Sequence, residues 1–187
     1  MVKKNACVFI SGYGSNLKNL IRSSRENNFP INIRLVVSNN PYADGILHAK
    51  KNSIPYLIIN TANRNFEKNI IKKIKEYKIS LICLAGYMKI ISKNFINTCG
   101  IKIINIHPSL LPKFKGLNTF ERILKNKEKK TGCTVHYVND KLDNGKTIIQ
   151  KSFYINKNDG VSILRKKTQI LEYKAFSEAI INIYRNS

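Results

Sequence analysis

Short apolar runs alternate with amphipathic runs along most of this sequence, and this alternation limits its possible folds more than any other feature. Residues 81–85, for example, are apolar throughout, which is typical of a strand buried on both faces of a parallel sheet. Residues 65–78 instead place isoleucines at helical spacing and lysines on the opposite side. Repetition of this pair predicts an α/β fold with a doubly wound, mostly parallel, Rossmann-like sheet.

The alternation gives an order of expected elements. We expect strands at residues 6–11, 31–37, 56–59, 81–85 and 101–106, and helices at 17–26, 44–52, 65–78, 93–98 and 119–127. Two further strands, 132–138 and 147–154, are joined by a turn-rich connector and not by a helix, which favours an antiparallel pair. A long helix at 161–184 follows. We predict one domain over residues 1–187.

The composition is that of a globular protein. Hydrophobic residues make up 43% of the 187 residues, and a chain of this length buries about 70% of its unfolded surface. No apolar run reaches the ~18 residues of a membrane helix. The apolar start runs at once into polar residues, so it predicts a first strand and not a signal peptide. We expect a cytoplasmic protein with no membrane partner, either a monomer or a homodimer.

The cysteines give no sign of a metal site. Cys7, Cys83, Cys99 and Cys133 are scattered, without a C-x-x-C pair or a Cys/His cluster of ligand spacing. We expect reduced thiols that pack as small hydrophobic residues, and no structural metal.

The formal net charge of +22 raises the possibility of a nucleic-acid partner. The basic residues recur as solvated helix faces, however, and are not gathered into one patch. We therefore favour compositional bias over a dedicated surface and predict no specific nucleic-acid partner. A basic field would still attract phosphorylated small substrates.

Residues 103–116, with the sequence I-I-N-I-H-P-S-L-L-P-K-F-K-G, form the most distinctive stretch. Asn105 and His107 are two apart, so a strand puts them on one face. Pro108 then ends the strand, and Pro112 keeps the next loop out of helix. This pattern favours a rigid pair of polar groups at a strand end, although a lone strand-end histidine is more often structural.

A glycine turn, G-Y-G-S-N at residues 12–16, connects the first strand to the first helix. This geometry points backbone N–H groups and the positive helix end at an anion. The third glycine of a dinucleotide fingerprint and the Walker lysine are absent, so a single phosphate beside Ser15 and Asn16 fits best. An ordinary helix cap remains the alternative. This turn and the loops 86–91 and 107–116 all follow strands, so we expect them to meet in one cleft.

Together these motifs resemble the phosphoribosylglycinamide formyltransferases, folate-dependent enzymes of purine biosynthesis. The resemblance covers nearly the whole chain and rests on S-G-Y-G-S-N (11–16), A-G-Y-M-K-I-I (85–91), N-I-H-P-S-L-L-P (105–112), V-H-Y-V (135–138) and L-D-N-G (142–145). It implies transfer of a formyl group from 10-formyltetrahydrofolate, as co-substrate, to the amine of glycinamide ribonucleotide.

The resemblance also implies roles for single residues. The matching catalytic residues are Asn105, His107 and Asp143. The matching acceptor site consists of Gly14, Ser15, Asn16 and Glu172. The matching folate site consists of Arg64, Met88, Lys89, Ile90, Ile91, Asn105 and Asp140. Asp140 belongs to a loop at 138–143 that matches the folate site as a whole.

Attack of an amine on a formyl carbon creates a tetrahedral oxyanion, which an amide and a protonated imidazole can stabilise. Asp143 beside His107 would favour the imidazolium and could orient a water. No enzyme nucleophile is needed, which agrees with the absence of a Ser–His or Cys–His pair in the sequence pattern.

Three residues depart from the family pattern: Lys89, where relatives usually have Arg, and Lys115 and Phe120, where they usually have Pro and His. His136 is a candidate for a supporting role, whereas His48 is predicted to have no catalytic role.

Three alternatives remain open. Methionyl-tRNA formyltransferases carry an additional C-terminal domain, which we expect this 187-residue chain to lack. Formyltetrahydrofolate hydrolases use water as acceptor, and their bacterial forms usually carry an N-terminal regulatory domain. A basic nucleic-acid-binding module that keeps the fold without the activity is the third.

Overall fold

A computed structural model describes residues 2–63 and 65–185. Contacts between residues divide the chain into two compact units, of which the first ends at Ile104 and the second begins at Asn105. Each unit is described by itself. The predicted single domain over 1–187 is not decided by this division and stays a prediction.

The predicted fold class is confirmed. The sheet has seven strands in the order β3-β2-β1-β4-β5-β6-β7. The strands are β1 (Lys4–Ile10), β2 (Ile31–Ser38), β3 (Tyr56–Ile58), β4 (Ile79–Leu84), β5 (Lys102–His107), β6 (Lys130–Tyr137) and β7 (Thr147–Tyr154). In the first unit, β1 pairs in parallel with both β2 and β4, and β2 pairs in parallel with β3.

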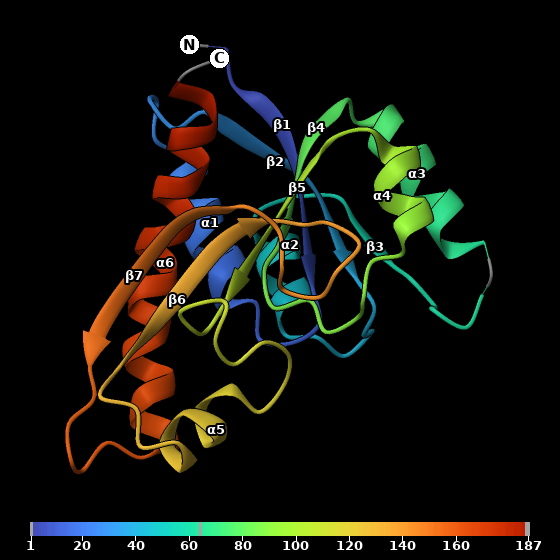
Figure 1. Ribbon diagram of the computed structural model, residues 1–187. Coiled ribbons are helices and arrows are strands. Elements are labelled where there is room, and N and C mark those ends of the chain that lie inside the picture. The colour runs from blue at the N-terminus through green and yellow to red at the C-terminus, as the bar shows by residue number, and fades with distance from the viewer. Residues whose placement is uncertain (1, 64, 186–187) are drawn as a thin grey trace. The chain divides into compact units, whose positions relative to one another are not determined.

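Four helices cover the sheet of the first unit (Figure 1): α1 (Ser15–Ser24), α2 (Gly45–Lys51), α3 (Phe66–Glu76) and α4 (Lys93–Cys99). Helices α1 and α2 pack against each other and against β2, while α3 packs against α4 and β4. The core lies along β1, where residues 6–10 are apolar and fully buried. This burial explains why β1 shows no polar alternation in the sequence.

The second unit contains α5 (Thr119–Lys125), β6, β7 and α6 (Val161–Arg185). Strands β6 and β7 form the predicted antiparallel pair, in which Thr134 lies opposite Gln150. Figure 1 shows α6 running along these two strands, and it packs against both of them. The apolar face of α6 includes Phe176, Ala179 and Ile180, all fully buried.

The predicted elements are confirmed, with differences of about two residues at their ends. Helix α1, for example, begins at Ser15 and not at residue 17, because Gly14 already turns the chain with a left-handed φ of 69°. Within the described residues, no helix is both long enough and apolar enough to cross a membrane.

Candidate active site

Strand β5 ends on the two residues that the sequence singles out. His107 is its last residue and has 6% of its surface exposed, while Asn105 is half-buried two positions earlier. Alternate strand residues share a face. Asn105 and His107 consequently both reach the same carboxylate, that of Asp143.

Both ring nitrogens of His107 face oxygen acceptors. Its Nε2 lies 2.9 Å from the carbonyl oxygen of Phe114, and its Nδ1 lies 3.2 Å from Oδ2 of Asp143. A carbonyl oxygen only accepts, so Nε2 carries a proton and donates it. This environment would suit an imidazolium.

Burial nevertheless holds the pKa of His107 below its ordinary value. The charge of Asp143 and the hydrogen bond to the Phe114 carbonyl raise this pKa, but together they do not offset the effect of burial. The predicted influence of Asp143 therefore has the expected sign. Loss of solvation outweighs this influence in the resting protein. The predicted imidazolium in the transition state stays a prediction.

Asp143 is the carboxylate at the centre of this cluster. Its Oδ2 accepts a 2.9 Å hydrogen bond from the N–H of Gly116, and its Oδ1 accepts a 3.4 Å bond from Nδ2 of Asn105. Burial alone would raise the pKa of Asp143, but the hydrogen bonds and the two nearby imidazoles together hold it below its ordinary value. Asp140, the other carboxylate of this connector, is exposed.

The backbone at Asp143 is itself unusual, with a left-handed φ of 45°. Non-glycine residues rarely adopt this conformation, and it is often found where function requires it. Gly145, two residues later, packs so closely that a Cβ atom there would overlap the carbonyl oxygen of Tyr137. The L-D-N-G motif thus allows the connector to turn tightly against β6.

His136 joins the cluster through both of its ring nitrogens. Its Nδ1 lies 2.8 Å from the carbonyl oxygen of Tyr137 and must donate to it, so Nε2 is free to accept from Nδ2 of Asn105 at 3.2 Å. The separation of 3.7 Å between Nε2 and Asp143 Oδ1 is too long for a hydrogen bond. His136 therefore fixes the orientation of the Asn105 amide.

The loop after β5 is braced by Thr134 of β6. The Thr134 hydroxyl donates to the Ser109 carbonyl at 2.7 Å and accepts from the N–H of Leu111 at 3.1 Å. Gln150 of β7 donates to Thr134 Oγ1 at 2.9 Å and to the Leu111 carbonyl at 2.8 Å. These bonds hold the segment that leads to Phe114, whose carbonyl contacts His107.

The Phe114 side chain packs against a small hydrophobic cluster of Phe120, Ile123 and Leu164. Phe120, one of the three departures from the family pattern, is thus a buried core residue. Lys115, the second departure, hydrogen-bonds through its ammonium group to Asn144 Oδ1, beside Asp143. Both departures stabilise the second unit and lie outside the hydrogen bonds of His107.

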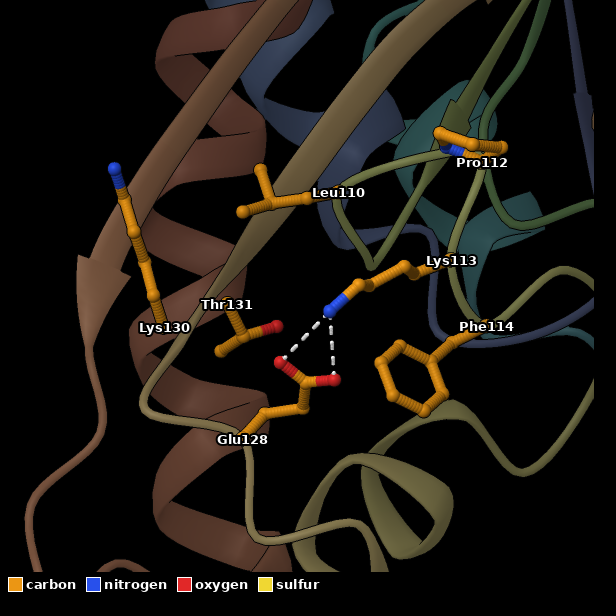
Figure 2. Close-up of a pocket in the computed structure, with 7 residues that line it drawn as sticks. All are labelled: Leu110, Pro112, Lys113, Phe114, Glu128, Lys130 and Thr131. Carbon is orange, nitrogen blue, oxygen red and sulfur yellow. Dashed lines mark hydrogen bonds and ion pairs between the residues drawn. The ribbon is translucent and has the colours of Figure 1, made fainter.

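A cavity of about 350 Å³ lies beside this loop in the second unit (Figure 2). It is lined by Leu110, Pro112, Lys113, Phe114, Glu128, Lys130 and Thr131. Lys113 Nζ reaches across it to the two carboxylate oxygens of Glu128, at 2.9 and 3.2 Å. Asn105, His107 and Asp143 do not line this cavity, so it is separate from the cluster.

In the first unit, the glycine turn after β1 begins helix α1 as predicted. A Cβ atom at Gly14 would lie 2.5 Å from the Cα of Gly45, so only glycine fits there. Ser15 is half-buried at the helix start, whereas Asn16 is only 7% exposed. Of the two predicted phosphate donors, Ser15 is thus the accessible side chain. The first N–H groups of any helix have no partner within it.

The loop that follows β4 lies next to the loop that follows β1. Ser11 Oγ accepts a 2.8 Å hydrogen bond from the N–H of Met88, so this N–H is already engaged. The side chains of Met88 and Ile90 are 67% and 80% exposed, and Lys89 is exposed as well, while Ile91 is half-buried. Arg64, the remaining predicted folate residue of this unit, lies outside the described residues.

Glu172 projects from α6 toward β6. Burial, followed by the charge of Glu172, raises the pKa of the Cys133 thiol to about 12. Cys7, Cys83 and Cys133 are buried free thiols. Within the part of the chain that the structure describes, no three His, Cys, Asp or Glu side chains form a group that could hold a metal ion.

Comparison with known proteins identifies the family. The model of the family described as formyl transferase matches residues 4–180. The chain belongs to this family. A curated formyl transferase relative, phosphoribosylglycinamide formyltransferase from Haemophilus influenzae, is 35% identical over 92% of this chain and 84% of its own length.

A second formyl transferase relative is larger. The human trifunctional purine biosynthetic protein adenosine-3 is 40% identical over 95% of this chain, but the chain spans only 18% of its length. Among solved structures, phosphoribosylglycinamide formyltransferase from Anaplasma phagocytophilum superimposes with a TM-score of 0.93 at 34% identity. That match covers 99% of this chain and 88% of the other.

The structure brings Asn105, His107 and Asp143 together, as the sequence predicts for a catalytic triplet, and adds His136 to them. Sequence reasoning missed the bracing pair Thr134 and Gln150 because both look like ordinary strand residues. Their opposed positions on β6 and β7 could have revealed them only once the strand register was known. The predicted meeting of three loops in one cleft stays a prediction.

Proposed function

We propose that this chain transfers the formyl group of 10-formyltetrahydrofolate to the primary amine of phosphoribosylglycinamide. The observation that carries the proposal is the buried cluster of Asn105, His107 and Asp143 at the end of β5. The names of the relatives from Haemophilus influenzae and Anaplasma phagocytophilum support the same reaction.

The reaction breaks the bond between the formyl carbon and the folate nitrogen and forms one to the acceptor nitrogen. Negative charge grows on the formyl oxygen, and Asn105 and His107 offer N–H donors for it. In the resting cluster, Asn105 Nδ2 donates to His136 at 3.2 Å and to Asp143 at 3.4 Å. We expect the longer bond to be the one that a substrate oxygen replaces.

The amine must lose a proton and the folate nitrogen must gain one. The depressed pKa of Asp143 keeps it ionised at neutral pH, so we assign it to orienting a water molecule that relays this proton. Since burial lowers the pKa of His107, we propose that the ring becomes protonated only as charge develops on the substrate. His136 keeps the amide of Asn105 correctly turned throughout.

Binding of the two substrates is assigned to other residues. We propose that Gly14, Ser15 and Asn16 at the start of α1 hold the acceptor phosphate, with Glu172 contacting the acceptor. The folate would lie against residues 89–91, and we also assign Met88, Arg64 and Asp140 to its site. Because Ser11 occupies the Met88 N–H, backbone contacts to the folate fall on Lys89, Ile90 and Ile91. No metal takes part in this proposal.

The test is an assay of folate deformylation by the purified protein, with and without phosphoribosylglycinamide. The proposal expects deformylation that depends on the acceptor and is lost in His107→Ala. Lys72→Ala, on the exposed side of α3, is the matched control and should keep full activity. Deformylation at the same rate without acceptor would identify a hydrolase. Absence of deformylation in both mixtures would contradict the proposal altogether.

A further inference from the structure

A concave groove of about 310 Å³ lies between helices α1 and α2 of the first unit. Both helices are labelled in Figure 1. The residues that line the groove are Lys18, Ile21, Arg22, Arg25, His48, Lys51 and Asn52. Four of these side chains are permanently charged cations and none is acidic. The groove therefore concentrates positive charge on a small area.

The arginines of this groove are held in place without being neutralised. Arg22 donates to the amide oxygen of Asn19 at 3.2 Å, and Arg25 donates to the amide oxygen of Asn52. Asn52 is itself fixed, because its Nδ2 donates to the His48 carbonyl at 2.7 Å. Neutral amides thus orient both guanidinium groups and leave their charge uncompensated.

Among the described residues, no carboxylate forms an ion pair with these cations. Across residues 2–63 and 65–185, none of the ion pairs includes Lys18, Arg22, Arg25 or Lys51. Cations gathered in this way repel one another. An anion bound among them would relieve this repulsion and would be attracted by each of the cations. Planar guanidinium groups match phosphate oxygens particularly well.

The spacing of the cations indicates the length of the anion. Lys18 and Arg22 lie four residues apart in α1, and Arg25, three residues later, is its C-cap. This spacing spreads them over roughly 10 Å along the helix axis. His48 and Lys51 line the same groove from α2. One phosphate cannot contact all of these groups, whereas a short linear chain of phosphates can.

We propose that the groove between α1 and α2 binds a linear di- or triphosphate group, either free or as part of a nucleotide. Its volume of about 310 Å³ is close to the lower limit for a small-molecule site, and this favours a small anion over a nucleic-acid duplex. The groove adjoins the turn assigned to the acceptor phosphate, since His48 lies beside Gly14, but none of Gly14, Ser15 and Asn16 lines it. The inference does not depend on the proposed formyl transfer.

The test measures binding of inorganic tripolyphosphate and of ATP to the full chain by calorimetry, at fixed physiological salt and without folate. The groove variant combines Arg22→Gln, Arg25→Gln and Lys51→Gln. A control variant combines Lys68→Gln, Lys72→Gln and Lys75→Gln, which remove the same charge from the exposed side of α3. Thermal melting verifies that both variants fold.

The proposal expects the groove variant to bind tripolyphosphate at least about tenfold more weakly, since several charge-assisted bonds are lost. The control variant should change affinity less than about twofold, because exposed distant charges are screened. Similar affinity for ATP and tripolyphosphate would assign the site to the phosphate chain alone. Tighter binding of ATP would assign it to a nucleotide.

Four results would overturn the proposal. The first is that the unmodified protein does not bind tripolyphosphate, and the second is that both triple variants lose affinity equally. The third is that Ser15→Ala loses as much affinity as the groove variant. The fourth is that a single-stranded RNA binds more tightly than tripolyphosphate and is equally sensitive to the groove substitutions. The second result would mean that dispersed charge binds the anion, and the third that the anion binds at the acceptor turn. The fourth would identify a nucleic-acid partner.

Discussion

The cluster at the end of β5 and the loops of the first unit differ in how they hold their polar groups. His107 and Asp143 are 6% and 9% exposed, and polar contacts to neighbouring residues fix both side chains. In the loop after β4, by contrast, Met88 and Ile90 are 67% and 80% exposed. One region fixes side chains among other side chains, while the residues of the other region are open to their surroundings.

This contrast indicates which region suits catalysis and which suits substrate binding. A buried network has low local dielectric and little freedom, so it suits groups that must meet developing charge without rearranging. Exposed loops with glycine turns suit contacts with the ends of substrates. Changes in the cluster should thus lower the turnover rate, and changes in the loops should weaken binding.

The largest effect is expected for His107→Ala. Loss of a positioned proton donor should lower turnover by roughly 10²–10⁴-fold, while the dissociation constants of both substrates should change little. Single-turnover kinetics and calorimetry measure the two quantities separately. If the substitution weakened binding and left the single-turnover rate intact, the division of work between cluster and loops would fail.

A smaller effect, on substrate binding by the loops of the first unit, is expected for Ser15→Ala. Removing a hydrogen bond to a charged phosphate should weaken acceptor binding by roughly 1–3 kcal/mol, without changing the rate at saturation. The dephosphorylated acceptor serves as the control, since it should bind both proteins equally poorly. Equal affinity of the unmodified protein for both acceptor forms would remove the phosphate assignment.

Asp143→Asn tests the electrostatics inside the cluster. The carboxylate raises the pKa of His107 against the larger effect of burial, so its removal should lower that pKa further. Titration of the ring by NMR gives the pKa directly, and Asp140→Asn is the matched control because Asp140 is exposed. A pKa that rose in Asp143→Asn, or that shifted as much in Asp140→Asn, would contradict the arrangement.

The smallest effect concerns stability and pH. The folded pKa of His107 is below its unfolded value of about 6.5, so below pH 6.5 the unfolded chain holds a proton that the folded chain lacks. The free energy of unfolding should therefore fall as pH drops from 6.5 toward the folded pKa. Urea unfolding of His107→Gln should show a flatter dependence in this range, and an unchanged slope would contradict the burial argument.

Much of the fold could be predicted from the sequence because its periodicity is strong. Apolar runs such as β4 and the lysine-faced helix α3 differ clearly in pattern, and the structure confirms both. The pair Asn105 and His107 could be predicted because two-residue spacing on a strand fixes a common face.

The remaining features depend on contacts between distant residues. The orientation of the His136 ring depends on the Tyr137 carbonyl, and the brace at Thr134 depends on its register opposite Gln150. The balance at His107 required the degree of burial, which sequence spacing does not give. The sequence thus predicted the partner of His107 and the direction of its influence on the pKa, but not the larger, opposite effect of burial.

The central claim is that His107 and Asp143 act as one unit, and a double-mutant cycle on the single-turnover rate tests it most directly. Their atoms lie 3.2 Å apart, and residues in contact are not expected to contribute independently. We expect the variant combining His107→Ala with Asp143→Asn to be about as slow as His107→Ala alone. A double variant that showed the full sum of both losses in rate would mean that Asp143 works without His107, contrary to this claim.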